Sequence, residues 1–213
     1  MTEHISNKPI DPDVKDAITE FGNICVGRTS VTLGKMLGMR VLIEPPRVHS
    51  GSFDLLAEDI AVPKDKVMVG ILMAMEDSIK GAMLFLVEKQ FIIDAVRIMT
   101  KKNISDLSLM EDEENLSAVR ELTNIMAASY MKELGDYLNM PIFLSPMMVG
   151  VDMVGALISF PLAYLEYSHR NVISIGAKFA LVDEKNGQTQ DTGHIIVFPD
   201  EDSVSMLAQA LGL

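Results

Sequence analysis

The chain contains 213 residues, of which 48% are hydrophobic and 23% are charged, and its net charge is −12. This is the composition of a globular protein with enough apolar residues for a core. The negative charge argues against nucleic acid or an anionic membrane as partner, because both bind to basic surfaces. Cys25 is the only cysteine, which excludes an internal disulfide. Because no segment has the pattern of a signal peptide or the length of a membrane span, we expect a cytoplasmic protein without membrane insertion.

The first half of the chain predicts a long helix, several strands and a shorter helix. The long helix runs from about Pro12 to Leu37, and Gly38 is well placed to end it. The shorter helix carries apolar residues at helical spacing. The predicted strands cover 41–48, 67–75 and 79–87, and the shorter helix covers 89–100.

The second half repeats this order of elements. Its long helix runs from about Glu113 to Leu138, and Asn139 holds the position that Gly38 holds in the first half. Several strand-like runs follow, and a last helix closes the chain. The runs cover 142–148, 151–160, 172–182 and 194–198, and the last helix covers 200–211.

Two polar segments, 75–78 and 183–191, are typical of hairpin turns. Hairpins make neighbouring strands antiparallel, so an α+β fold is favoured over a doubly wound parallel sheet. We predict one domain over 1–213, made of two repeats at about 12–101 and 113–213. A pseudo-two-fold arrangement would join the half-sheets into one antiparallel or mixed sheet, with both long helices on one side.

The pair Glu20-x-x-Asn23 recurs as Glu121-x-x-Asn124, 101 residues later (124 − 23). Apolar residues around the pairs align as well, as any two related helices require. A hydrophobic core has no use for an unpaired carboxylate or amide. Two polar residues kept at one spacing in both copies therefore indicate a surface that is used twice.

Each pair belongs to a stripe along one face of its helix. At about 100° per residue, the polar positions fall within a narrow sector, and a very small residue follows the asparagine by one turn. A small residue there lets a partner come close to the carboxylate and the amide. The first stripe is Asp16, Glu20, Asn23 and Gly27, and the second is Ser117, Glu121, Asn124 and Ala128.

A single Glu-x-x-Asn pair is most often just a solvated helix face, but repetition in register favours a function. The four histidines show no metal-ligand spacing, and Cys25 falls on the core side of its helix. An asparagine is not a strong base, although it can hold a water molecule at a fixed distance and angle. This suits hydrolysis of a phosphoryl group that is already bound to another protein, which depends mainly on positioning and electrostatics.

The stripes resemble the signature of the CheC family of chemotaxis phosphatases, in which Asp or Ser precedes Glu-x-x-Asn and a proline follows about 22 residues later. The first copy matches completely, from Asp16 to Pro46. The second copy begins at Ser117 and reaches Pro146 one residue early, and Thr123 stands where the family often has glycine.

The resemblance implies that each long helix presents a site to the phosphorylated response regulator CheY. By position, Asn23 and Asn124 would orient the attacking water, and Glu20 and Glu121 would contact a lysine of the regulator. The regulator would supply Mg²⁺, so the protein needs no cofactor of its own. The family also implies a partnership with CheD, a receptor-modifying deamidase, to which no residues are assigned.

Two other interpretations compete with a phosphatase. The first is a non-catalytic module, either a CheD-binding scaffold or a part of a flagellar switch resembling FliY. The chain ends directly after its last predicted helix, whereas FliY proteins append further domains. The second is a relative of CheX, which typically uses one such helix per chain and works as a dimer; two intact motifs argue against it here.

Overall fold

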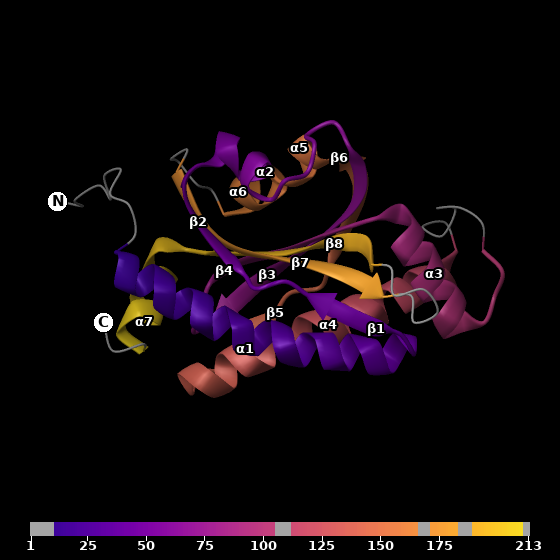
Figure 1. The fold of residues 1–213 in the computed structure, drawn as a ribbon, viewed down its shortest axis with the longest axis horizontal. Coiled ribbons are helices and arrows are strands. Elements are labelled where there is room, and N and C mark those ends of the chain that lie inside the picture. The colour runs from indigo at the N-terminus through magenta and orange to yellow at the C-terminus, as the bar shows by residue number, and fades with distance from the viewer. Residues whose placement is uncertain (1–10, 105–111, 166–170, 183–188, 211–213) are drawn as a thin grey trace.

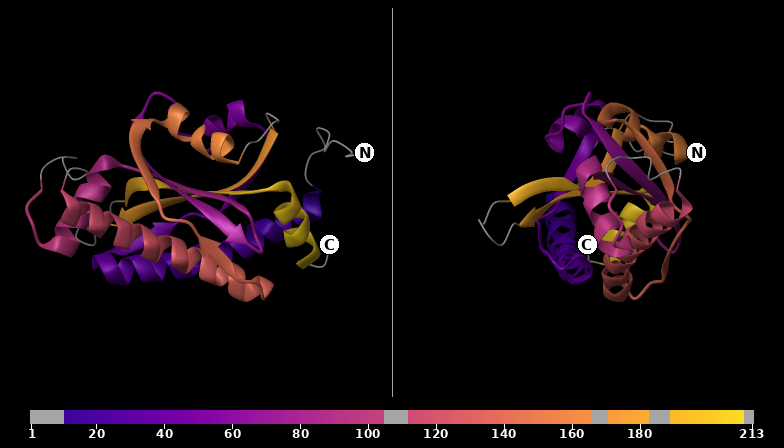
Figure 2. Two further views of the ribbon diagram at one scale, coloured as in Figure 1. Left: turned by 180° about the vertical axis from the view of Figure 1, so that it is seen from behind. Right: turned by 90° about the vertical axis from the view of Figure 1, so that its right-hand side faces the viewer.

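The computed structural model describes residues 11–104, 112–165, 171–182 and 189–210. An antiparallel sheet lies between two layers of helices (Figure 1). The two long helices, α1 (Pro12–Leu37) and α4 (Glu113–Leu138), cover one face side by side. Short helices cover the other face, and α3 and α7 flank the ends of the sheet (Figure 2). These helices are α2 (Leu56–Asp59), α3 (Lys89–Thr100), α5 (Val154–Leu157), α6 (Phe160–Tyr164) and α7 (Glu201–Ala210), with a 3-10 turn at Phe53–Leu55.

The order of the strands has the symmetry of a pseudo-two-fold axis. Along the sheet it is β1-β7-β8-β4-β3-β5, with β2 also on β7 and β6 also on β3. If β1 to β4 are matched with β5 to β8, this order is the same from either end. The strands are β1 (Arg40–Ile43), β2 (Arg47–Ser52), β3 (Val67–Asp77), β4 (Gly81–Val87), β5 (Ile142–Leu144), β6 (Met148–Met153), β7 (Asn171–Val182) and β8 (Thr189–Pro199).

This arrangement confirms the predicted α+β fold, with an antiparallel sheet and two long helices on one side. The division into repeats at 12–101 and 113–213 stays a proposal, which the strand order supports. The numbering supports it too, because β2 and β6 are 101 residues apart at both ends (148 − 47 and 153 − 52).

The two central strands, β4 and β8, meet at the pseudo-axis. Leu84 lies opposite Ile196, while Gly81 pairs with Pro199 and Gly193 with Val87. A Cβ atom at either glycine would come within 3 Å of a carbonyl oxygen on the other strand. Glycine at both places therefore permits the close contact that joins the half-sheets.

Both faces of the central strand β4 are buried, which explains its continuous apolar sequence. In β4, Met83, Phe85 and Val87 point to the core under the long helices, whereas Ala82, Leu84 and Leu86 point to the core under the short ones. Side chains alternate between faces along a strand, so a strand that is buried on both faces is apolar at successive positions.

The ends of the long helices follow from their capping residues. The carboxylates of Asp11 and Asp112 accept hydrogen bonds from backbone N–H groups in the first turn of α1 and α4. Gly38 and Asn139 adopt the left-handed conformation that ends each helix. The predicted bounds of α1, α3 and α4 are confirmed.

Several predicted strands need correction. The run 41–48 is two strands, β1 and β2, which both pair with β7. Pro45 and Pro46 separate them, because a proline has no N–H group to donate to the ladder. The run 142–148 likewise divides between β5 and β6, and 151–160 holds the end of β6 followed by α5 instead of one strand. The first hairpin turns at 78–80, slightly later than predicted, and most of the predicted turn at 183–191 lies outside the described residues. Within the described ranges, no helix is both long and apolar enough to cross a bilayer.

Candidate active site

The structure places the whole first stripe on the solvent-facing side of α1. Asp16, Glu20, Asn23 and Gly27 are all exposed. The opposite side of the helix packs on the sheet through buried residues that include Ile18, Cys25 and Leu33. Amphipathic spacing thus fixes which way the stripe points, since rotating α1 would expose its apolar side.

The second stripe has the same environment on α4. Ser117, Glu121, Asn124 and Ala128 are exposed, while the core side of the helix is buried. Within the described part of the chain, the side chains of both Glu-x-x-Asn pairs form no hydrogen bond or ion pair with other residues. All four are therefore available to an incoming molecule, although the structure does not test their roles, which stay predictions.

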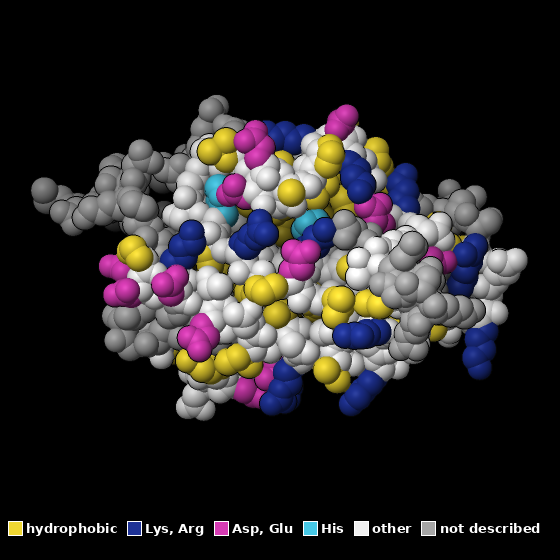
Figure 3. Space-filling view, in the orientation of Figure 1, with side chains coloured by type: hydrophobic (Ala, Val, Ile, Leu, Met, Phe, Trp, Pro, Cys, Tyr) yellow, Lys and Arg dark blue, Asp and Glu magenta, His cyan; other side chains and the backbone are white. Residues whose placement is uncertain are grey.

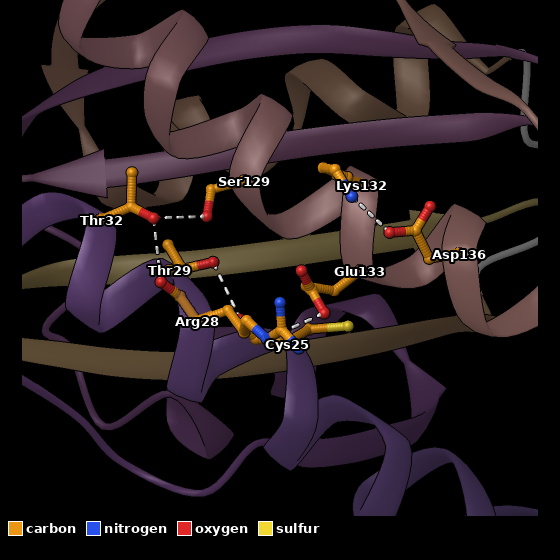
Figure 4. Close-up of polar contacts among 8 residues, drawn as sticks. All are labelled: Cys25, Arg28, Thr29, Thr32, Ser129, Lys132, Glu133 and Asp136. Carbon is orange, nitrogen blue, oxygen red and sulfur yellow. Dashed lines mark hydrogen bonds and ion pairs between the residues drawn. The ribbon is translucent and has the colours of Figure 1, made fainter.

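Polar contacts join α1 and α4 where the helices cross (Figure 4). The Ser129 hydroxyl donates to the Thr32 hydroxyl at 3.2 Å, and Arg28 Nε lies 3.4 Å from a carboxylate oxygen of Glu133. Position 129 corresponds to 28, and position 133 to 32, at the spacing of 101 residues. The two contacts are therefore the same pair of positions, related by the pseudo-axis.

These contacts also define the geometry of the helix pair. Residue numbers rise along one helix as they fall along the other, so the helices are antiparallel, with their crossing near Ser30 and Met131. The Arg28 side chain is 71% exposed, so its ion pair contributes little free energy of folding. Buried apolar residues hold the helices together, and the polar contacts fix their register.

The two stripes lie far apart on this pair. Asn23 precedes the crossing by seven residues (30 − 23), and Asn124 does so too (131 − 124), which gives about 10 Å along each helix in opposite directions. Around α1, the stripe lies about 130° from the direction of Arg28 and Thr32, which face α4. Each stripe therefore occupies its own outer flank and its own end of the helix pair.

Two differences between the copies have a packing explanation. A Cβ atom on Gly22 would lie 2.5 Å from Cγ of Pro46, so the proline ring requires glycine there. In the second copy Met147 takes the place of Pro46, at the spacing of 101 residues, and Thr123 takes that of Gly22. Thr123 is buried and its hydroxyl donates to the Val119 carbonyl oxygen at 2.8 Å. A flexible methionine leaves room for that side chain, whereas a proline ring does not.

One feature of the first site was missed by the sequence analysis. Ile24, directly after Asn23, is 47% exposed, whereas its counterpart Ile125 is only partly exposed. From the sequence, both isoleucines were expected to be buried as packing residues of their helices. The structure instead places this isoleucine at the surface beside the Asn23 side chain.

The thiol nearest to the first stripe is unsuited to nucleophilic catalysis. Cys25 is fully buried, and burial, aided by the negative charge of Glu133, raises the pKa of its thiol to about 12. A thiol with such a pKa is protonated at neutral pH, and the thiolate is the reactive form. This agrees with its predicted place on the core side of α1.

Comparison with known proteins identifies the family. The model of the CheC-like family matches residues 14–50, which contain the first stripe and Pro46. A Bacillus subtilis (strain 168) protein described as CheY-P phosphatase CheC is 30% identical over 207 residues, covering 95% of this chain and 96% of the relative. The chain belongs to the CheC-like family.

Solved structures of other members of this fold are similar over most of the chain. FliY from Thermotoga maritima superposes with a TM-score of 0.70 at 21% identity, covering 96% of this chain and 98% of that chain. CheX from Desulfovibrio desulfuricans superposes with a TM-score of 0.53 at 17% identity, covering 85% and 99%. These likenesses establish a fold shared by CheC-like, FliY and CheX proteins.

Proposed function

We propose that this CheC-like protein is a phosphatase that hydrolyses the aspartyl phosphate of a CheY-like response regulator. One observation carries the proposal: Asn23 and Asn124 are exposed, each one turn after an exposed glutamate on matching helices, and their side chains form no hydrogen bond with another described residue. The description of the B. subtilis relative as CheY-P phosphatase CheC supports this reaction and this substrate. A chemotaxis regulator as substrate implies a cytoplasmic location.

In the proposed reaction, the asparagine positions a water molecule. Its amide oxygen accepts a hydrogen bond from the water, which directs a lone pair of the water oxygen at phosphorus. A new bond forms between that oxygen and phosphorus while the bond to the aspartate oxygen breaks. Inorganic phosphate leaves with the protons of the water, and the aspartate carboxylate is regenerated. The regulator's own Mg²⁺ stabilises charge on the phosphoryl oxygens, so no cofactor of this protein is needed.

The other residues of each stripe serve docking. Glu20 and Glu121 contact a lysine of the regulator and set the register of the complex. Gly27 and Ala128 leave space for the approaching surface, and Asp16 and Ser117 extend the polar contact by one turn. Such fixed geometry accounts for catalysis without an acid, a base or a nucleophile on the protein itself.

The decisive experiment follows the decay of a phosphorylated CheY-like regulator with wild type and with the Asn23→Ala/Asn124→Ala double variant. Loss of water positioning predicts a fall of roughly 10²-fold or more in the accelerated rate. The double variant should fold normally, because both side chains are exposed and have no hydrogen-bond partner in the described part of the chain. Unchanged phosphate release in the folded double variant would exclude this mechanism.

A non-catalytic module is the second candidate, and the similarity to FliY over nearly the whole chain favours it. In that role the stripes would hold a regulator, or other surfaces would hold CheD, without hydrolysis. Co-purification with either partner, with no change in the lifetime of the phosphorylated regulator, would support the module over the phosphatase.

A further inference from the structure

A groove of about 580 Å³ runs along the N-terminal half of α1, on the side of the helix away from α4. Its walls come from α1, the β1–β2 connection, β2, α2, β7 and β8. In Figure 3, lysine, arginine and histidine side chains gather in this hollow, between α1 and the layer that contains α2. Its size is that of sites for small molecules.

The groove has a positive charge in a protein whose net charge is −12. Asp59 pairs with His49, and Glu44 lies 3.9 Å from Lys178, so both acidic groups of the lining already have partners. Lys15 and Arg47 form no ion pair or side-chain hydrogen bond with other described residues. Two uncompensated cations thus face one cavity.

The inner wall adds buried polar groups. Ser174 is 1% exposed and His194 is 8% exposed, and both line the groove. The His49 side chain is 9% exposed, and its Nε2 atom has no hydrogen-bond partner among the described residues. Buried polar atoms are nearly always hydrogen-bonded, so the unpartnered Nε2 atom of His49 indicates that a ligand completes this wall.

The charged residues of the groove have no counterparts in the second half of the chain. The positions 101 residues after Lys15 and Arg47 are Leu116 and Met148, and the position after His49 is Gly150. The second half therefore lacks the cations and the histidine, although it keeps the Glu-x-x-Asn stripe. A feature present in one half alone has a separate role from one that both halves share.

We propose that this groove binds a small anion that carries phosphate or carboxylate groups. Arg47 provides the planar, multidentate donor that such groups prefer, and Lys15 provides a second charge. Nucleic acid is disfavoured by the acidic remainder of the molecule, and the concave shape suits a ligand small enough to be enclosed. The ligand would lie beside the first stripe, because Thr19 and Pro46 both line the groove.

The test is an NMR titration with inorganic phosphate and, separately, with citrate, at an ionic strength held constant with sodium chloride. Saturable shifts of the backbone amides of groove residues such as Thr19, His49 and Ser174 are expected with at least one of the two anions. Arg47→Gln and Lys15→Gln should each weaken binding about tenfold. Lys35→Gln, on the same helix but outside the groove, is the matched control and should bind normally.

Shifts that grow linearly, or that Lys35→Gln reduces as much as Arg47→Gln does, would overturn the proposal. So would failure of both anions to bind. Circular dichroism checks that each variant is folded, and Lys15→Gln, on an exposed helix position, serves if Arg47→Gln does not fold. The Asn23→Ala/Asn124→Ala variant should bind the anion like wild type, so the outcome is independent of the phosphatase proposal.

Discussion

Asn23 and Asn124 lie on opposite flanks and toward opposite ends of the antiparallel α1–α4 pair. The contacts between Thr32 and Ser129 and between Arg28 and Glu133 fix this arrangement, since they set the crossing in the C-terminal half of each helix. Neither asparagine faces the other helix. A regulator bound to one stripe therefore leaves the other stripe accessible.

The first prediction concerns the independence of the two sites. Asn23→Ala and Asn124→Ala should each retain a part of the wild-type rate, and the two residual rates should sum to about the wild-type value, because distant sites act additively. The initial rate of dephosphorylation of the regulator measures this. Complete loss of activity in both single variants would show that the sites depend on each other.

The second prediction separates docking from water positioning. In the Asn124→Ala background, where only the first site works, Glu20→Gln should raise KM about fivefold with a smaller effect on kcat, because a partly exposed ion pair contributes about 1 kcal/mol. Glu121→Gln should do the same in the Asn23→Ala background. Glu58→Gln, an exposed substitution on α2, is the control. A fall in kcat alone would assign the glutamate to the chemical step.

The third prediction concerns the small residue of the first stripe. No atom lies within 4 Å of a Cβ built on Gly27, so alanine fits there. Gly27→Ala should raise the free energy of unfolding by about 0.5–1 kcal/mol, as in other exposed helix interiors, and keep activity, since the second stripe has Ala128. Gly27→Leu in the Asn124→Ala background should reduce activity about tenfold or more, because its side chain would displace the regulator. Urea unfolding and dephosphorylation assays measure the two effects, and full activity of Gly27→Leu would disprove the need for close approach.

The fourth prediction concerns the contact between Gly22 and Pro46. Gly22→Ala should lower the free energy of unfolding by about 1–3 kcal/mol, because the new methyl group overlaps the proline ring. In a Pro46→Ala background the same change should cost less, and a double-mutant cycle in urea measures the difference. Equal losses in both backgrounds would contradict steric conflict as the cause.

The sequence predicted the long helices well because their ends depend on local chemistry. Asp11 and Asp112 cap the starts, and Gly38 and Asn139 adopt the conformation that ends them. Amphipathic spacing similarly predicted that both stripes would be exposed. These features depend on residues that are close together in the sequence, so a local pattern is enough to predict them.

Features that depend on distant parts of the chain were not predicted. The run 151–160 is apolar enough for a strand, but the backbone N–H groups of Val154 and Gly155 donate to carbonyl oxygens at 64–66, which turns the chain into α5. Leu157 then packs against Gly70 on β3. Short apolar runs are ambiguous between strand and helix, and here a segment far along the chain decides the outcome.

The polar contacts at the helix crossing were unpredictable for the same reason. Arg28, Thr32, Ser129 and Glu133 are ordinary residues of amphipathic helices in the sequence, and their partnership appears only once α1 and α4 are packed. The groove likewise combines residues from five elements. Lys15 and Arg47 remain without an acidic partner there because Glu44 pairs with Lys178 and Asp59 pairs with His49.

The strand order makes each half of the molecule incomplete by itself. Among the described residues, β1 and β2 pair only with β7, and β5 and β6 pair only with β3. A chain containing one half would expose these edges, and exposed edges recruit strands from another molecule. Two copies of such a half could complete one another by exchanging strands, as an obligate homodimer with identical sites. In a single polypeptide each half is free to diverge, and the groove beside α1, whose cations have no counterpart in the second half, is such a difference.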